Sequence, residues 1–253
     1  MDHLRMLPFL ELFNFRDVGG YVGLNGRRVR WRRLFRSDSL HRLGPADQAT
    51  FADLGVRTVI DLRRPSEVAL TGRVPGFVDG GYRNMPPKHA EWDIVEGYER
   101  LNGTDAVGWL TDRYLELARD GRADLAAVVG VIADRDAAPL VVHCAAGKDR
   151  TGIVCALTLS LLGVADTDIA ADYALSVHGV RRFADWLRQT NPSFVFDPSR
   201  SYAASPAETM LRFLETLRER YGSIERYLVD GGLADHQVTA LRAHLLEDGQ
   251  PEL

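Results

Sequence analysis

The chain has 253 residues, of which 45% are hydrophobic and 26% are charged, which is typical of a globular protein that can bury a sizeable core. Its net charge of −4 argues against wholesale binding to nucleic acid or to an anionic membrane. The two cysteines make no disulfide framework and favour a reducing, cytoplasmic compartment, although export without a signal peptide stays open. The sequence contains no apolar run of about 20 residues, so no membrane-spanning helix is expected.

The first elements are short and separated by turn signals. Asn25-Gly26 is a strong two-residue turn signal and predicts a hairpin over residues 21–36. A helix is expected over residues 45–54, with a proline in its first turn. Residues 56–62 form a β-branched run that is typical of a buried strand.

The middle of the chain begins with a stretch that resists assignment. Residues 64–105 contain several prolines and glycines, and we interpret them as a long irregular segment, which in a compact domain is often functional. Helical patterns follow at 106–119 and 123–134, and residues 140–143 form a short apolar strand. The apolar helix expected over 151–162 is hydrophobic nearly all round and therefore predicts a central, buried helix.

The last third of the chain is expected to be helical. Residues 178–204 are interpreted either as a lid over a site or as ordinary packing. We find no linker long enough to divide residues 1–253 into two domains. The fold class predicted is therefore α/β, a mostly parallel sheet with helices on both faces. Helices are expected over 167–177, from a capping box at 205–208 to about 220, and after the caps Ser223 and Asp235.

The segment HCAAGKDRTG, residues 143–152, lies between the predicted strand and the apolar helix. A turn there directs backbone N–H groups into a concavity at the positive end of the helix dipole, which suits a phosphate dianion. Ala145, Ala146 and Gly147 are small enough to let the backbone approach such a ligand closely. Cys144 begins the loop, where the helix N-terminus favours the thiolate, the nucleophilic form of the side chain.

The second half of the loop carries the polar side chains. Arg150 follows Cys144 by six residues, and its planar fork matches two phosphoryl oxygens. Thr151 is placed to donate a hydrogen bond to the cysteine sulfur as it leaves in a second step. Lys148 either presents a second cation at the rim, suited to a second phosphate on an inositol ring, or offsets nearby acids. Asp149 either caps the amides of the loop or acts as an acid.

This loop resembles the signature loop of the cysteine-based protein tyrosine phosphatase superfamily. More narrowly, it is similar to bacterial tyrosine phosphatases that also accept phosphoserine, phosphothreonine and phosphoinositides. The resemblance implies a phosphatase fold and a two-step reaction through a phosphocysteine that needs no metal or other cofactor. Shorter strings agree in the same order: NFRDVGG at 14–20, RSD at 36–38, DLR at 61–63, DY at 172–173 and YGSIERYL at 221–228.

The resemblance implies a phosphotyrosine protein as the substrate, with a phosphoinositide as the alternative. A non-catalytic module that only binds phosphate esters is an alternative of another class. The presence of Cys144, Arg150 and Thr151 together argues against that alternative. The oligomeric state does not follow from the sequence.

A phosphatase of this kind also needs a general acid to protonate the leaving oxygen. Asp61 ends the strand expected beside that of Cys144, and catalytic residues gather at such strand ends, so it ranks first. Asp149, within the loop, ranks second, and Asp93, in the irregular stretch, ranks third. The rival role for Asp61 is structural, holding Arg63 or the loop.

Overall fold

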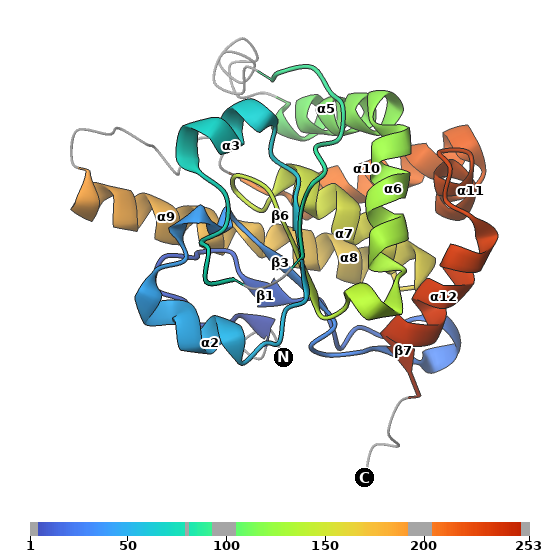
Figure 1. Ribbon diagram of the computed structural model, residues 1–253. Coiled ribbons are helices and arrows are strands. Elements are labelled where there is room, and N and C mark those ends of the chain that lie inside the picture. Colours follow the sequence, from blue (N-terminus) through green and yellow to red (C-terminus); the bar gives the residue numbers. More distant parts are fainter. Residues whose placement is uncertain (1–4, 79–80, 93–104, 192–203, 249–253) are drawn as a thin grey trace.

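The computed structural model describes residues 5–78, 81–92, 105–191 and 204–248 (Figure 1). A five-stranded sheet lies at its centre, in the order β1-β3-β6-β4-β5. Only β1 is antiparallel to its neighbour, so the prediction of a mostly parallel sheet is confirmed. The strands are β1 Arg16–Asp17, β3 Leu34–Ser37, β4 Thr58–Asp61, β5 Gly81–Asn84 and β6 Leu140–His143.

Side chains of the central strands alternate between two hydrophobic clusters, one on each face of the sheet. In β6, Leu140 and Val142 join the larger cluster, whereas Val141 joins the smaller one with Phe35 and Val59. This follows from the strand geometry, since successive side chains point to opposite faces. Both faces are buried, and the apolar runs seen in the sequence are what such strands require.

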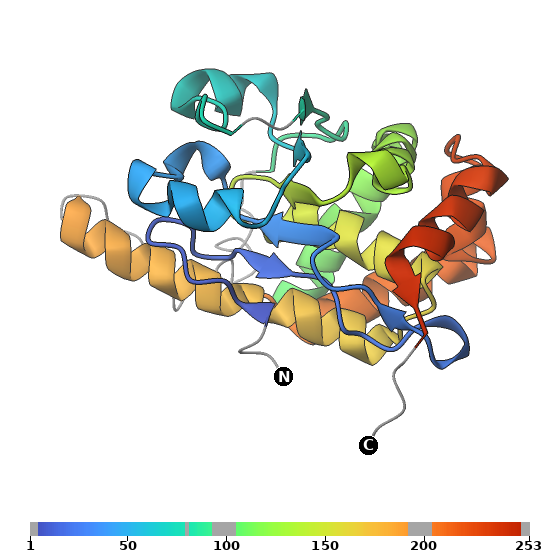
Figure 2. The same ribbon diagram turned by 60° about the horizontal axis from the view of Figure 1, so that its bottom comes forward.

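Helices cover both faces of the sheet, as expected (Figures 1 and 2). The smaller cluster is closed by α2 (Gln48–Ala52) together with the N-terminal segment. Two further helices are less deeply packed: α3 (Pro65–Thr71) has no buried residue, and α9 (Ser176–Thr190) buries only Ser176, Gly179 and Ala184. The larger cluster contains side chains from α5 (Ala106–Asp120), α6 (Arg122–Ile132), α7 (Asp149–Leu161), α8 (Asp166–Ala174), α10 (Ala207–Tyr221), α11 (Ile224–Val229) and α12 (Asp235–Leu245).

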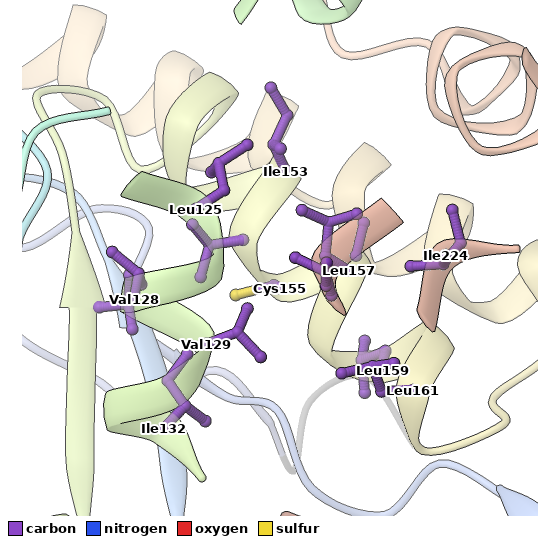
Figure 3. Close-up of a cluster of buried hydrophobic side chains, with 14 of the residues drawn as sticks. Leu125, Val128, Val129, Ile132, Ile153, Cys155, Leu157, Leu159, Leu161 and Ile224 are labelled. Atoms are coloured by element: carbon purple, nitrogen blue, oxygen red, sulfur yellow. The ribbon is translucent and has the colours of Figure 1, made fainter. Parts of the chain in front are cut away.

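The central helix α7 is buried along almost its whole length, as its all-round hydrophobicity predicted. Figure 3 shows Cys155 among apolar side chains that include Leu125, Val129 and Leu157. Burial raises the pKa of the Cys155 thiol to about 11, so this cysteine stays protonated at neutral pH and serves as packing.

The hairpin expected over residues 21–36 forms only in part. The chain turns at Asn25, and Val22 pairs with Arg28 in an antiparallel bridge across the turn. The strand after the turn, β2 (Arg28–Val29), also forms a ladder with β7 (Leu246–Glu247) near the C-terminus. Residues Leu34–Ser37 instead enter the central sheet. The turn residues could not reveal this, because the ladder partner of β2 lies at the other end of the chain.

The stretch 64–105 is also more regular than expected, since it contains α3 and the edge strand β5. The polar side chains of β5 hid it, because an exposed edge strand lacks the apolar signature of a central one.

Three of the predicted helix starts can be compared with the structure. Ser223 caps α11 through the Arg226 amide, as predicted. Asp235 is instead the first residue of α12. The capping box at 205–208 does not form, because the Ser205 hydroxyl donates to the carbonyl of Ala174.

The segment 178–204, interpreted as either a lid or packing, is only partly described. Its residues up to Thr190 belong to α9, and the rest lies mostly outside the described residues. Among the described helices, none is long and apolar enough to cross a membrane.

Candidate active site

The loop 144–148 joins the end of β6 to the start of α7, as the sequence predicted. Strand β6 lies between β3 and β4, so His143 is in register with Ser37 on one side and with Asp61 on the other. The residues that follow these strands therefore gather around the loop. This arrangement is usual for parallel α/β sheets, in which ligands bind beyond the carboxyl ends of the strands.

The carbonyl oxygens of the loop point outward and are held there by hydrogen bonds from neighbouring segments. Asn14 and Arg36 make the side-chain contacts, and they come from the NFRDVGG and RSD strings. The donors are the Ser39 amide to Ala145 O (3.1 Å), Asn14 Nδ2 to the oxygens of Ala146 and Gly147 (3.0 Å each), and Arg36 Nη2 to Gly147 O (2.8 Å).

Outward carbonyls determine where the amides point. In a planar trans peptide, the C=O of one residue and the N–H of the next point in opposite directions. The amides of Ala146, Gly147 and Lys148 consequently face the inner side of the loop, at the N-terminus of α7. Gly147 has φ +64°, and a Cβ there would lie 2.4 Å from Ser37 O, so only glycine fits. The loop is thus built as an anion cradle.

A buried charge cluster supports the cradle from below. Arg36 and Arg16 both contact the Asp172 carboxylate, at 2.5 and 3.1 Å, and all three side chains are almost fully buried. Burial alone raises the pKa of Asp172, but the two guanidinium groups outweigh it and lower this pKa to about 2. Two arginines against one carboxylate leave a positive charge beneath the loop, which favours an anion in the cradle.

Arg150 is oriented by a carboxylate that the sequence analysis did not identify. Its Nη1 and Nη2 atoms bind the two oxygens of Glu67 in α3 at 2.6 and 2.8 Å, and Nη1 also donates to Leu62 O. These contacts use three of the five N–H groups of the guanidinium. Among the described residues, Nε and the second Nη2 hydrogen have no acceptor, so one edge of Arg150 remains available to two oxygens of an anion.

The Glu67 carboxylate is strongly held in its charged form. Burial raises its pKa, but hydrogen bonds from Arg150 and from the Arg64 amide outweigh burial and lower the pKa to about 2. The Arg64-Pro65 start of a helix with glutamate at its third position is a capping pattern that the sequence could have revealed. The contact between Glu67 and Arg150 could not be predicted from this local pattern, because the two residues lie far apart in the sequence.

Cys144 is buried at the start of the loop. Burial lowers the pKa of Arg150, but the hydrogen bonds that Arg150 donates to Glu67 and the charge of Cys144 act in the opposite direction, so the pKa of Arg150 lies above its ordinary value. Thr151 is buried as well, and its hydroxyl has no hydrogen-bond partner among the described residues. Cys144 thus begins the loop after β6, and Arg150 and Thr151 lie in the first turn of α7 at its other end.

Asp61 does not fit the role of general acid that ranked first. Its carboxylate is fully buried and pairs with Arg63 at 2.6 Å, and it also accepts hydrogen bonds from the Arg63 amide and the Tyr82 hydroxyl. Burial raises the pKa of Asp61, but the contacts with Arg63 and the charge of His143 outweigh it, so the pKa lies below its ordinary value. This geometry matches the rival role, a structural partner of Arg63.

Asp149 is in a different situation. It lies in the first turn of α7, next to Arg150, and 16% of its side chain is exposed. One carboxylate oxygen accepts a hydrogen bond from the buried Tyr114 hydroxyl at 2.6 Å, and that hydroxyl also contacts the Tyr173 hydroxyl at 2.7 Å. Asp93, the third candidate, lies outside the described residues.

Lys148 is not the exposed rim cation that one of its two interpretations required. Its side chain is 6% exposed, and Nζ donates to the carbonyl of Ala204 and lies 3.4 Å from Asp149. The contact with Asp149 agrees with the other interpretation, in which Lys148 offsets a nearby acid. The backbone amide of Lys148 still faces the cradle.

Comparison with known proteins identifies relatives along almost the whole chain. The model of a family described as the tyrosine phosphatase family matches residues 7–247. The triple specificity protein phosphatase PtpB of Mycobacterium tuberculosis is 32% identical over 96% of this chain and 99% of its own length. A putative tyrosine-protein phosphatase of Cupriavidus necator is 31% identical over 95% of this chain and 88% of its own length. A tyrosine-protein phosphatase of Nostoc commune is 27% identical over 85% of this chain and 74% of its own length.

Proposed function

Because this chain belongs to the tyrosine phosphatase family, we propose that it hydrolyses phosphotyrosine in proteins through a phosphocysteine intermediate. The observation that carries the proposal is the cradle. The amides of the cradle face inward, and the cradle begins at Cys144. Glu67 binds one edge of the Arg150 guanidinium, and the other edge stays available to an anion. A tetrahedral phosphoryl group needs such a set of donors around a single nucleophile.

The reaction has two steps. In the first, the Cys144 thiolate attacks phosphorus, the bond from phosphorus to the tyrosine oxygen breaks, and Asp149 gives its proton to that oxygen. In the second, water attacks the phosphocysteine, Asp149 takes its proton, and the sulfur leaves as a thiolate next to the Thr151 hydroxyl. Arg150 and the loop amides hold the non-bridging oxygens in both steps. We assign the acid to Asp149 because it is partly exposed beside the cradle, whereas Asp61 is sealed in an ion pair.

A broader specificity is the second candidate. The name of PtpB describes that relative as a triple specificity protein phosphatase. The sequence argument for phosphoinositides depended on Lys148 at the rim, and its burial removes that support. We therefore place phosphotyrosine first and phosphoserine, phosphothreonine and phosphoinositides after it.

One panel of substrates tests the proposal. Peptides carrying phosphotyrosine, phosphoserine or phosphothreonine and short-chain phosphoinositides are compared by kcat/KM in the presence of EDTA. We expect the highest value for phosphotyrosine and no loss on chelation, because the proposed reaction uses no metal. A strict metal requirement, or no hydrolysis of any phosphate ester, would overturn the proposal.

We also propose a reducing, cytoplasmic setting for the enzyme. Both described cysteines, Cys144 and Cys155, are free thiols, and the reaction requires that Cys144 stays reduced. Fractionation of the native cells with an antibody against the chain tests this proposal, and recovery outside the cytoplasm would contradict it.

A further inference from the structure

A cavity of about 330 Å³ opens beside the cradle, between α3 and α9. Its floor includes the exposed side chains of Ala145 and Ala146 from the loop. Among the described residues, neither Cys144 nor Arg150 lines it. The cavity is therefore adjacent to the phosphoryl position and separate from it, and an occupant would be a group attached near the phosphorylated residue.

The walls of this cavity are mainly apolar. Val180 and Phe183 lie three residues apart on α9 and so share one face of that helix. Leu70 of α3 also lines the cavity, and this residue is 85% exposed to solvent. Leu70 also lies three residues after Glu67, so the same face of α3 holds Arg150 and lines the cavity.

The charged side chains around the cavity are paired. Arg42 contacts Asp38 at 2.5 Å, and Glu67 is taken by Arg150. Arg63 contacts Asp61 at 2.6 Å. Burial lowers the pKa of His41 to about 4, so this side chain is neutral at pH 7. The described lining therefore offers no unbalanced positive charge to a second phosphate. Binding of an apolar group is favoured instead, because it buries apolar surface against the walls.

We propose that this cavity is a substrate subsite that binds an apolar side chain adjacent in the peptide to the phosphotyrosine. The proposal rests on the phosphatase function proposed above. Continuity with the Ala145–Ala146 rim places the subsite within reach of a neighbouring residue, since consecutive Cα atoms are about 3.8 Å apart. It also gives a reason for a peptide, rather than an inositol ring carrying several phosphates, to be the preferred substrate.

The wild-type enzyme provides the first test. Phosphotyrosine peptides that carry leucine, alanine or aspartate at each of the two positions on either side of the phosphotyrosine are compared, with p-nitrophenyl phosphate as a substrate that has no neighbouring residue. We expect leucine at one of these positions to raise kcat/KM about tenfold over alanine, and aspartate to lower it. Equal values for the three peptides at every position, or a preference for aspartate, would overturn the subsite.

Variants locate the preference. Leu70→Ala and Val180→Asp should reduce the leucine-to-alanine ratio toward one, because each removes apolar surface from the proposed subsite. Leu10→Ala is the matched control, since Leu10 is also exposed but does not line the cavity, and it should keep the wild-type ratio. A ratio that survives in both subsite variants would place the preference elsewhere.

The two proposals can fail separately. If wild type hydrolyses p-nitrophenyl phosphate but does not distinguish the peptides, the subsite is wrong and the phosphatase assignment stands. If it hydrolyses no phosphate ester, the phosphatase assignment fails and the subsite fails with it.

Discussion

Two carboxylates flank the cradle, and they differ in how they are held. Asp61, at the end of β4, is fully buried and receives hydrogen bonds from Arg63 and Tyr82. Asp149, at the start of α7, is partly exposed and is held by the Tyr114 hydroxyl. A position near the end of a parallel strand is thus not enough to make a carboxylate an acid. Access to the substrate and the partners of the carboxylate decide its role.

The largest expected effect concerns the nucleophile that both carboxylates would flank. Cys144→Ser should lower kcat on p-nitrophenyl phosphate by at least about 10⁴-fold, because a serine hydroxyl is far less ionised than a cysteine thiol. The unfolding temperature should change little, since the side chains are close in size. Near wild-type turnover in this variant would contradict the role of Cys144 as the nucleophile. The comparison of Asp61 and Asp149 as acids would then lose its basis.

Asp149→Asn tests the exposed side of the comparison. Loss of the proposed acid should lower kcat on an alkyl phosphate by about 10²–10⁴-fold, because its leaving oxygen needs a proton. On an aryl phosphate with a very good leaving group the loss should be much smaller. Steady-state kinetics across a series of leaving groups measure this dependence. A uniform loss across the series would assign the acid to another residue.

Asp61→Asn tests the buried side. We expect a loss of about 3 kcal/mol in the free energy of unfolding, close to a hundredfold in the folding constant, because the substitution removes the charge that pairs with the buried Arg63. Kinetics should show no dependence on the leaving group. Urea unfolding measures the first effect, and a leaving-group dependence like that of Asp149→Asn would return Asp61 to the role of acid.

The same variant carries a pH signature. The folded-state pKa of Asp61 is lowered, so the stabilisation is fully present above the unfolded pKa of about 3.9 and is lost as the pH falls through the folded value. The stability difference between wild type and Asp61→Asn should accordingly be constant near neutral pH and shrink below about pH 4.

Tyr114→Phe should have the smallest effect, because it removes one hydrogen bond from Asp149 and leaves the carboxylate in place. We expect a loss of about tenfold in kcat on poor leaving groups and less on good ones. Tyr227→Phe is the control, since it also removes a buried hydroxyl, here one that donates to Ala118 O away from the cradle. Equal losses on all substrates would make Tyr114 a structural residue that does not act through Asp149.

Local patterns were enough to predict the cradle and its strand. The run at 140–143, the small residues after Cys144 and the apolar helix that follows determine a strand–loop–helix unit without reference to the rest of the chain. The same reasoning predicted the neighbouring strand, and the structure confirms it as β4, which ends at Asp61. These predictions succeeded because apolar periodicity and turn residues act over a few positions.

The partners of these residues could not be predicted in the same way. Glu67 orients Arg150, Asn14 turns the loop carbonyls outward, and Tyr114 holds Asp149, and each lies more than thirty residues away in the sequence. The ladder of β2 with β7 is another long-range contact of this kind.

The sequence by itself was enough to predict the chemistry proposed for the cradle, because the proposed nucleophile, the cation and the small residues between them lie in one short segment of the chain. Only the tertiary structure decided that Asp61 is buried in an ion pair with Arg63, that Asp149 is partly exposed, and that Lys148 is buried rather than at the rim. The physical reason is that burial and pairing depend on what packs against a side chain. For Asp61, Asp149 and Lys148 the contacts that matter include Tyr82, Tyr114 and Ala204, which the fold brings to them from other elements.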